Sequence, residues 1–224
     1  MRLSVRLTGL ALLAALAPTA ARARAVRDGK IAAVGTSAEI RALAGPATRV
    51  IALGGRTVIP GLIDSHMHAI RAALFYATEV NWIGTHGEAA ARRTPPIKTA
   101  MNIGLHIGGG TDAHRVTSYD PMVSLQWMID GRTVAGTPTR DADARPSREE
   151  ALRLYTQGSA WFTFDDDKRG AFEAGRLADL AVLSKDVMTV PADEIGGIES
   201  SVTMVGGRIV HAAEPFLASK QKYP

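Results

Sequence analysis

Short apolar runs broken by tight-turn residues characterise both ends of the chain. Asp28-Gly29 and Gly206-Gly207 each separate two such runs, and Gly54-Gly55 separates another two. These pairs favour two-residue turns between antiparallel strands, because glycine and aspartate tolerate the positive φ angles that such turns need. The pattern therefore predicts sheet structure at both ends, with strands at residues 25–28, 30–34, 49–53, 56–59, 178–183, 202–205 and 208–211.

Helix-start signals lie between these strands. Residues 36–39 (TSAE) form a capping-box pattern, so a short helix is expected to follow. Asp120-Pro121 supplies a good N-cap and first helical position for a helix that ends at Gly131. Residues 147–150 (SREE) open another helix. The polar, proline-containing stretch 136–146 predicts a surface loop between the last two helices.

The most informative apolar run covers residues 58–68 and ends in two histidines. Side chains at i and i+2 of a strand share one face, so His66 and His68 could reach one metal ion. The apolar Leu62-Ile63 pair before them suits a buried parallel strand whose carboxyl end opens into a site. Two histidines in this spacing also occur on ordinary exposed strands and loops, and the pair alone favours that interpretation over a metal site.

Composition narrows the class of protein. The 224 residues are 46% hydrophobic and 21% charged, an ordinary globular balance with room for one or two domains. The net charge of +4 is modest and the arginines are scattered, so no basic stripe indicates a nucleic acid partner. The chain has no cysteine, which excludes disulfides, thiolate metal ligands and cysteine nucleophiles.

The start of the chain has the three-part pattern of a secretory signal peptide. Arg2 and Arg6 precede an apolar run over residues 7–17, and Ala21-Arg22-Ala23 is typical of a cleavage site. The apolar run is about half of the roughly 20 residues that a spanning helix needs, which favours a cleaved signal over a membrane anchor. We therefore expect an exported protein, periplasmic or secreted, that begins near Arg24 and has no stable membrane anchor after signal cleavage.

The stretch PGLIDSHMH, residues 60–68, follows a Gly-Gly turn and closely resembles the first barrel strand of the metal-dependent amidohydrolase superfamily. Its continuation to residue 84 looks like the amidohydrolase-3 branch, which includes exoenzyme-regulatory-like and N-acyl-amino-acid-deacylase-like proteins. The resemblance implies an α/β fold in which a (β/α)₈ TIM-like barrel is inserted into a small β-sandwich built from both termini. The expected divisions are a signal peptide at 1–23, a discontinuous β-sandwich at 24–58 and 175–213, a barrel segment at 59–174 and a C-terminal tail at 214–224.

A second informative run, IGGGTDAHR, covers residues 107–115. In the resembled family a Gly-Thr-Asp-Ala segment ends the last barrel strand, and its aspartate binds metal and handles the proton of the attacking water. Asp112 matches that aspartate. The resemblance thus implies a Zn²⁺ site of His66, His68 and Asp112, with Asp112 as the catalytic residue and a small-molecule amide as substrate. Without the resemblance, an aspartate in a glycine-rich turn is more often a residue that hydrogen-bonds its own backbone.

The chain is too short for a whole barrel. Only 43 residues separate His68 from Asp112, whereas each β–α–β step takes roughly 30 residues or more. The segment 59–174 has 116 residues, against about 250 for a complete barrel, so we expect a truncated barrel with the first and last strands only. The family's further ligands on the middle strands have no counterpart here, which leaves at most one metal ion. The join is expected between about residues 87 and 95.

Two interpretations follow. The chain is either a metal-dependent hydrolase of carbon–nitrogen bonds in non-peptide amides, or a non-catalytic remnant that only binds or assembles. In a closed barrel the first and eighth strands are neighbours, so their three ligands could stay together after the strands between them are lost. The loss would expose strand edges and apolar faces, which favours self-association and makes a homo-oligomer possible.

Overall fold

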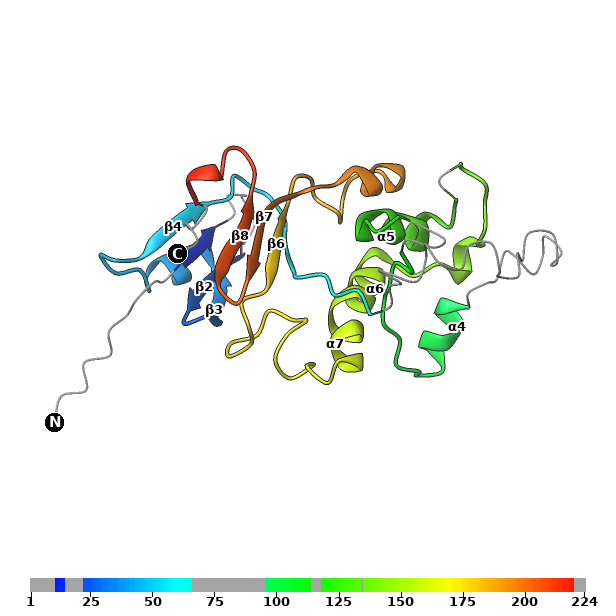
Figure 1. The fold of residues 1–224 in the computed structure, drawn as a ribbon, viewed down its shortest axis with the longest axis horizontal. Coiled ribbons are helices and arrows are strands. Elements are labelled where there is room, and N and C mark those ends of the chain that lie inside the picture. The colour runs from blue at the N-terminus through cyan, green and yellow to red at the C-terminus, as the bar shows by residue number, and fades with distance from the viewer. Residues whose placement is uncertain (1–10, 15–21, 66–95, 114–117, 134, 220–224) are drawn as a thin grey trace, which may run out of the picture. The chain divides into compact units, whose positions relative to one another are not determined.

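The computed structural model describes residues 11–14, 22–65, 96–113, 118–133 and 135–219 (Figure 1). These residues form two compact units, and each unit draws on separate parts of the chain. The sheet unit contains the described residues up to Gly61, then Asp167–Asp186 and those from Glu199 onward. The helical unit contains the described residues of Leu62–Asp166 and Val187–Ile198.

Two four-stranded sheets make up the sheet unit. The first has the order β3-β2-β1-β4 and is antiparallel except for the parallel pair β1 and β4. The second has the order β5-β6-β7-β8 and is antiparallel throughout. The elements are β1 (Ala11–Ala14), β2 (Arg22–Arg27), β3 (Lys30–Thr36), α1 (Ser37–Arg41), β4 (Arg49–Ala52), β5 (Val58–Pro60), β6 (Leu180–Leu183), β7 (Ser200–Val205), β8 (Arg208–Ala212) and the 3₁₀ turn η4 (Leu217–Ser219).

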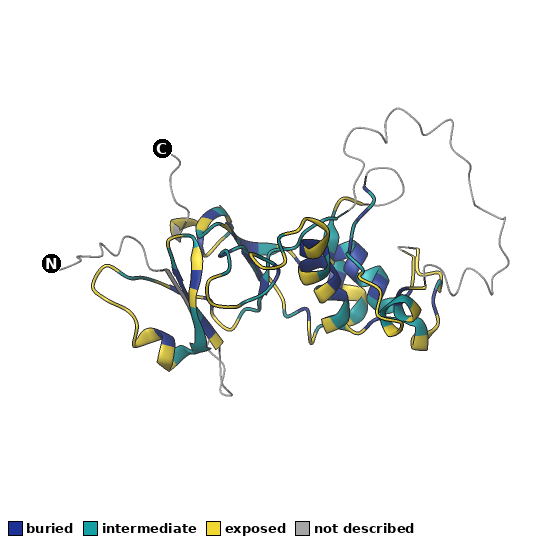
Figure 2. Ribbon diagram, turned by 90° about the horizontal axis from the view of Figure 1, so that it is seen from below, coloured by how far each residue is buried: buried dark blue, intermediate teal, exposed yellow. Residues whose placement is uncertain are grey.

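An apolar core lies between these two sheets (Figure 2). Val26 and Ile31 of the first sheet belong to the same buried cluster as Leu180, Val202 and Met204 of the second. Burying each such side chain contributes about 1.5–3 kcal/mol. Strands from both ends of the chain therefore share one core, and the arrangement is a small sandwich.

The hairpin turns from the two ends of the chain pack against each other. Asp28 and Gly29 have φ angles of 51° and 78°, and Gly206 and Gly207 have 53° and 76°, as type I′ turns require. A Cβ atom on Gly29 would lie 2.9 Å from the Gly206 carbonyl oxygen, and one on Gly207 would lie 2.8 Å from the Gly29 Cα. Both predicted hairpins are confirmed, and glycine is needed at residues 29 and 207 for close approach as well as for the turn itself.

The Gly54-Gly55 turn does not close a hairpin. β4 pairs with β1, whereas β5 pairs with β6 through Val58–Val182 and Ile59–Ala181. The turn instead carries the chain from one sheet to the other, so the predicted pairing of residues 49–53 with 56–59 is wrong. The alternating pattern of a strand fixes which face is buried but leaves its partner open.

Strand β1 lies within the predicted signal peptide. It pairs with residues 23–26 of β2 on one side and with β4 on the other. Ala23 is fully buried and packs with Ala25 and Ile40. Cleavage before Arg24 would remove both β1 and Ala23, and it would leave β2 and β4 without a partner along the edges that now face β1.

The sheet unit also extends into the predicted tail at 214–224. Phe216 is 5% exposed and belongs to the core shared by the two sheets. The guanidinium carbon of Arg56 lies 5.1 Å from the centre of its ring, within the range of a cation–π contact. Residues beyond 213 thus contribute to the core that the two sheets share.

Short helices make up the helical unit. α5 (Pro121–Asp130) begins as predicted, because Asp120 accepts a hydrogen bond from the Met122 N–H at 2.8 Å, and it ends at Gly131 with a φ angle of 63°. The capping box at the start of α6 (Arg148–Arg153) is also confirmed. The other elements are α4 (Ile97–Asn102), the 3₁₀ turns η1 (Ala142–Ala144) and η3 (Ala192–Gly197), the π-helical turn η2 (Leu154–Gly158) and α7 (Ser159–Phe162).

The expected barrel strands do not form in the described part of the helical unit. Residues 62–65 and 105–112 have no regular secondary structure, and β5 ends at Pro60. Among the described residues between 61 and 174, the β-type pairing is limited to the isolated bridge Arg132–Pro138. A strand needs a continuous partner edge, and the described residues offer none to either run.

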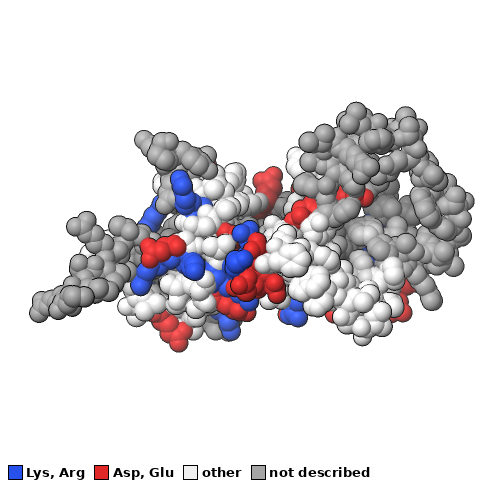
Figure 3. Space-filling view, turned by 60° about the horizontal axis from the view of Figure 1, so that its bottom comes forward, with Lys and Arg blue, Asp and Glu red and all other residues white. Residues whose placement is uncertain are grey.

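Charges of both signs are interspersed on the sheet unit, on the face that Figure 3 shows. Arg176 pairs with Glu173 at 2.8 Å, and Arg169 lies 3.8 Å from Asp179.

No helix in the described part of the chain is both long enough and apolar enough to cross a membrane.

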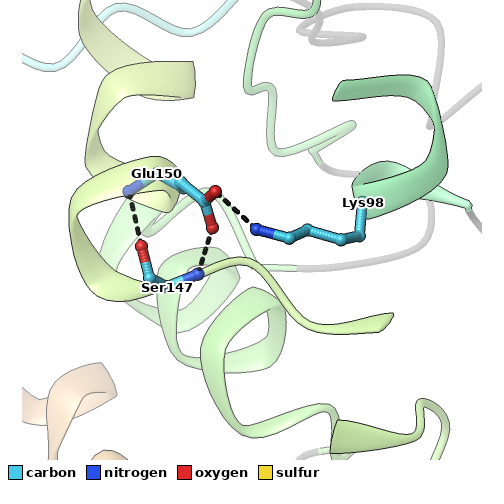
Figure 4. A network of polar contacts seen from close by, with 3 residues as sticks. All are labelled: Lys98, Ser147 and Glu150. Atoms are coloured by element: carbon cyan, nitrogen blue, oxygen red, sulfur yellow. Dashed lines mark hydrogen bonds and ion pairs between the residues drawn. The ribbon is translucent and has the colours of Figure 1, made fainter. Parts of the chain in front are cut away.

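An ion pair joins α4 to α6 in the helical unit (Figure 4). The Lys98 Nζ lies 2.5 Å from the Glu150 Oε1, and both side chains are about one-third exposed. The other carboxylate oxygen of Glu150 accepts the Ser147 N–H at 2.7 Å in the capping box. The hydrogen bond from Lys98 and then that from Ser147 lower the pKa of Glu150.

Removing residues 1–23 should destabilise the sheet unit, because β1 pairs on both sides. We expect a chain that begins at Arg24 to melt at least about 5 °C below the full chain, as follows when a protein of this size loses about 2 kcal/mol or more. Thermal melting followed by circular dichroism measures the difference. A chain that lacks only residues 220–224 controls for shortening, and equal midpoints for all three chains would contradict the role of β1.

A double-mutant cycle should separate the Lys98–Glu150 pair from a more exposed pair on the same helix. We expect a coupling energy of about 0.5–1 kcal/mol between Lys98→Ala and Glu150→Ala. Arg153 and Glu149 lie 2.8 Å apart but are 60% and 72% exposed, so their coupling should stay below about 0.5 kcal/mol. Urea unfolding of each set measures both values, and equal couplings would refute the greater strength of the Lys98 pair.

Candidate metal centre

Asp112 is the predicted ligand that falls within the described residues. Its side chain is half-buried and its φ angle is 52°, in the left-handed region. Aspartate is one of the few residues besides glycine that adopt this conformation. His66 and His68 lie outside the described residues, as do His86, Glu88, His114 and Arg115.

Backbone contacts bring the end of the first motif beside the second. The Ser65 N–H donates to the Gly109 carbonyl oxygen at 3.1 Å, and the Ser65 hydroxyl donates to the same oxygen at 2.8 Å. The chain enters residues 66–68 directly from Ser65, and Asp112 follows Gly109 by three residues. The described part of the first expected strand therefore lies beside the second, although neither forms a strand.

A carboxylate strengthens this contact. Asp64 accepts the Thr111 N–H, at 3.1 Å to Oδ1 and 3.2 Å to Oδ2, and it accepts the Thr111 hydroxyl at 2.5 Å. Thr111 is 1% exposed. Hydrogen bonds to an ionised carboxylate are shorter and stronger than those between neutral groups. Asp64 therefore holds the residue that precedes Asp112.

The π-helical turn η2 supplies further backbone partners. The Leu154 carbonyl oxygen accepts the Gly109 N–H at 2.9 Å, and the Tyr155 carbonyl oxygen accepts the Ile63 N–H at 2.7 Å. A π turn departs from the regular α-helical bonding pattern, and such turns are frequent where a helix serves a site. Here carbonyl groups of the helix accept hydrogen bonds from residues 63 and 109, as a partner strand would in a sheet.

Glycine permits this close approach at two positions. A Cβ atom on Gly158 would lie 2.1 Å from the Ile107 carbonyl oxygen, and one on Gly109 would lie 2.6 Å from the Tyr155 ring. Neither distance can accommodate a carbon atom, so any other residue would push the helix away from residues 107–109.

Tyr155 is fully buried against this contact. Burial raises the pKa of its phenol to about 12, and the negative charge of Asp64 acts in the same direction, whereas the Ser124 hydroxyl opposes the shift. The phenol therefore stays protonated and neutral over the physiological pH range.

The sequence patterns do not single out Asp64, Thr111 or Tyr155. Period-two spacing could have identified Asp64, because residues 64, 66 and 68 share one face of an extended chain. Nothing in the sequence distinguishes Thr111 or Tyr155 from ordinary core residues, since their partners lie 47 and 92 positions away along the chain.

Three further side chains of the helical unit that could serve a site lie in other surroundings. His106 stacks on Trp161, with ring centroids 4.2 Å apart and planes within 3°. Lys98 pairs with Glu150, and Tyr119 is 67% exposed. Within the described ranges, no three histidine, cysteine, aspartate or glutamate side chains gather closely enough to hold a metal ion.

The raised pKa of Tyr155 predicts a loss of stability at high pH. A group whose pKa is higher in the folded state stabilises the protein fully below its unfolded pKa of 10.0, and this contribution disappears as the pH rises to about 12. We expect the parent to lose about 2 kcal/mol more than Tyr155→Phe across this range, because each pKa unit corresponds to about 1.4 kcal/mol.

Urea unfolding at pH values between about 9 and 12 measures this difference. Tyr119→Phe is the matched control, since that exposed tyrosine should leave the parent's profile unchanged. Parallel profiles for the parent and Tyr155→Phe would contradict the shift.

Comparison with known proteins identifies the chain's relatives. A model of the amidohydrolase family matches residues 49–86 and 82–211. An N-substituted formamide deformylase from Arthrobacter pascens is 46% identical over 112 residues, which cover 50% of this chain and 20% of that protein. An imidazolonepropionase from Solibacter usitatus (strain Ellin6076) is 56% identical over 48 residues, 21% of this chain and 11% of that protein.

This chain thus matches about a fifth or less of the length of these two curated relatives. Among solved structures, E. coli guanine deaminase is similar in fold, with a TM-score of 0.62 at 12% identity and coverage of 94% of this chain and 100% of that chain. The two matches to the family model together span more than half of this chain. The chain therefore belongs to the amidohydrolase family.

Proposed function

We propose that the chain is a metal-dependent hydrolase of carbon–nitrogen bonds in small non-peptide amides. His66, His68 and Asp112 would together hold one divalent ion, Zn²⁺. The observation that carries the proposal is the contact between Ser65 and Gly109, because it brings the chain leading into the histidines beside the turn that contains Asp112.

The chemistry of the donor set fits a catalytic zinc ion. Two imidazoles and one carboxylate are ligand types that zinc uses in hydrolases, where three protein ligands leave a fourth position open. The half-buried Asp112 carboxylate is held in a turn whose conformation is fixed on both sides. Ligands for a second ion have no counterpart among the residues that match the family.

Asp112 would handle the protons of the reaction. A bound zinc ion supplies an acidified water and polarises the amide carbonyl. Asp112 takes a proton from the attacking water and then gives it to the departing nitrogen. One water is consumed: a carbon–oxygen bond forms, the carbon–nitrogen bond breaks, and the products are a carboxylic acid and an amine.

N-substituted formamides are the first substrates to test, because the formamide deformylase is a relative at 46% identity. The alternative is a non-catalytic remnant that binds metal or assembles without turnover. The absence of barrel strands among the described residues of 61–174 favours that alternative, since barrel loops normally position the substrate. Zinc binding without formamide hydrolysis would support it.

Export and assembly are further parts of the proposal. The signal-like start of the chain supports a periplasmic or secreted protein, and the shortened barrel segment supports a homo-oligomer. The amide substrate and a second copy of the chain are the proposed partners, with no nucleic acid among them.

We expect the purified chain, equilibrated with Zn²⁺ and freed of excess metal, to retain about one zinc ion per chain. The double variant His66→Ala/His68→Ala should lose it, because the remaining carboxylate alone binds zinc weakly. Elemental analysis measures the stoichiometry. His106→Ala is the control, since that imidazole stacks on Trp161 and should not affect the ion. Retention of zinc by the double variant would place the ion elsewhere.

A further inference from the structure

Hydrogen bonds flank Asp112 on both sides, and they connect its neighbours to the carboxylate of Asp64. Asp64 accepts both the N–H and the hydroxyl of Thr111. The Thr111 Oγ1 in turn accepts the Ala113 N–H at 3.2 Å. The residues on both sides of Asp112 are therefore fixed, directly or through Thr111, by Asp64.

We infer that Asp64 is a positioning residue for Asp112. Thr111 and Ala113 are 1% and 0% exposed, so their N–H groups need protein acceptors. Between them, Asp112 has a left-handed backbone at a φ angle of 52°, a conformation that is unfavourable for most residues other than glycine. The bonds to Asp64 and Thr111 offset this cost and hold the Asp112 turn before any ligand arrives.

The position of Asp64 in the chain gives the network a second consequence. Asp64 precedes His66 by two residues, so one carboxylate connects the segment that leads to both histidines with the turn that carries Asp112. Ser65, the residue between them, makes its own bonds to Gly109. Two adjacent residues of the first motif thus fix the second motif at two points, 109 and 111.

This role differs from that of a metal ligand. Among the described residues, both Asp64 oxygens accept hydrogen bonds from Thr111, and the role inferred here acts through the placement of Asp112. Partners that orient metal ligands typically change metal affinity by about 10–100-fold when they are removed. The zinc part of the inference rests on the proposed function, whereas the ordering of the turn does not.

Asp64→Asn tests the inference in the metal-free chain. An amide oxygen in the place of Oδ2 can still accept from both Thr111 groups, but it carries no charge, and the amide NH₂ then faces the Thr111 N–H, so both bonds become weaker. We expect the Thr111 and Ala113 amide hydrogens to exchange with deuterium at least about 10-fold faster, as follows from losing about 1.4 kcal/mol of protection. Nuclear magnetic resonance measures each amide separately.

Two references make the result specific. The Gly131 N–H, bonded to the Trp127 carbonyl oxygen at 3.1 Å, should keep its rate, because general destabilisation would accelerate it as well. Thr111→Ser keeps the hydroxyl and should stay within about 3-fold of the parent at all three amides. If Asp64→Asn fails to fold, Thr111→Val serves instead, since it removes the acceptor of the Ala113 N–H and should accelerate that amide.

Zinc titration provides the second measurement. We expect Asp64→Asn to bind Zn²⁺ about 10–100-fold more weakly than the parent and Thr111→Ser to bind it within about 3-fold. Unchanged exchange at residues 111 and 113, or unchanged zinc affinity in a parent that binds zinc, would overturn the inference. A parent that binds no zinc would defeat the proposed function alone, and the exchange rates would still decide the role of Asp64.

Discussion

The backbone N–H and carbonyl group of Gly109 connect the separate segments of the helical unit. Its carbonyl oxygen accepts the N–H and hydroxyl of Ser65 and the hydroxyl of Ser159, and its N–H donates to Leu154. Three stretches far apart in the chain therefore meet at one buried residue. A Cβ atom there would strike the Tyr155 ring, so the contact exists only because residue 109 has no side chain. Losing the Leu154 acceptor would leave the buried Gly109 N–H unsatisfied, which typically destabilises a protein by about 1–3 kcal/mol.

A helix, not a strand, completes this contact. In a full barrel each strand has a neighbour on both sides. Here the runs at 62–65 and 107–112 bond to each other at Gly109 and Thr111 without forming sheet pairing in the described part of the chain. A regular α-helix could offer few acceptors, because its carbonyl groups are already bonded within the helix. The π turn at Leu154–Gly158 relaxes that pattern, and the carbonyl oxygens of Leu154 and Tyr155 accept N–H groups from both runs.

The sequence predicted what local chemistry decides. The Asp28-Gly29 turn and the caps at Thr36, Asp120 and Ser147 form as expected, because each depends on residues at most three positions apart. The partner of a strand depends on distant residues instead, which is why β4 and β5 belong to different sheets and why the apolar run at 11–14 could not be assigned to a sheet from its own pattern. For the site, the motifs pointed to His66, His68 and Asp112. The Asp64–Thr111 network required knowing that residues 47 positions apart lie in contact.

Binding a metal ion and hydrolysing an amide place different demands on this chain. Binding needs only that a few ligands converge, and contacts at Gly109 and Thr111 hold the turn that carries Asp112 beside Asp64 and Ser65. Hydrolysis also needs a substrate that is held in line with the attacking water and shielded from solvent. Such positioning can lower the activation free energy by several kcal/mol. In complete barrels, loops at the ends of the barrel strands position the substrate. The network around Asp112 bears on the proposed metal binding alone, because it orders one proposed ligand and holds no substrate.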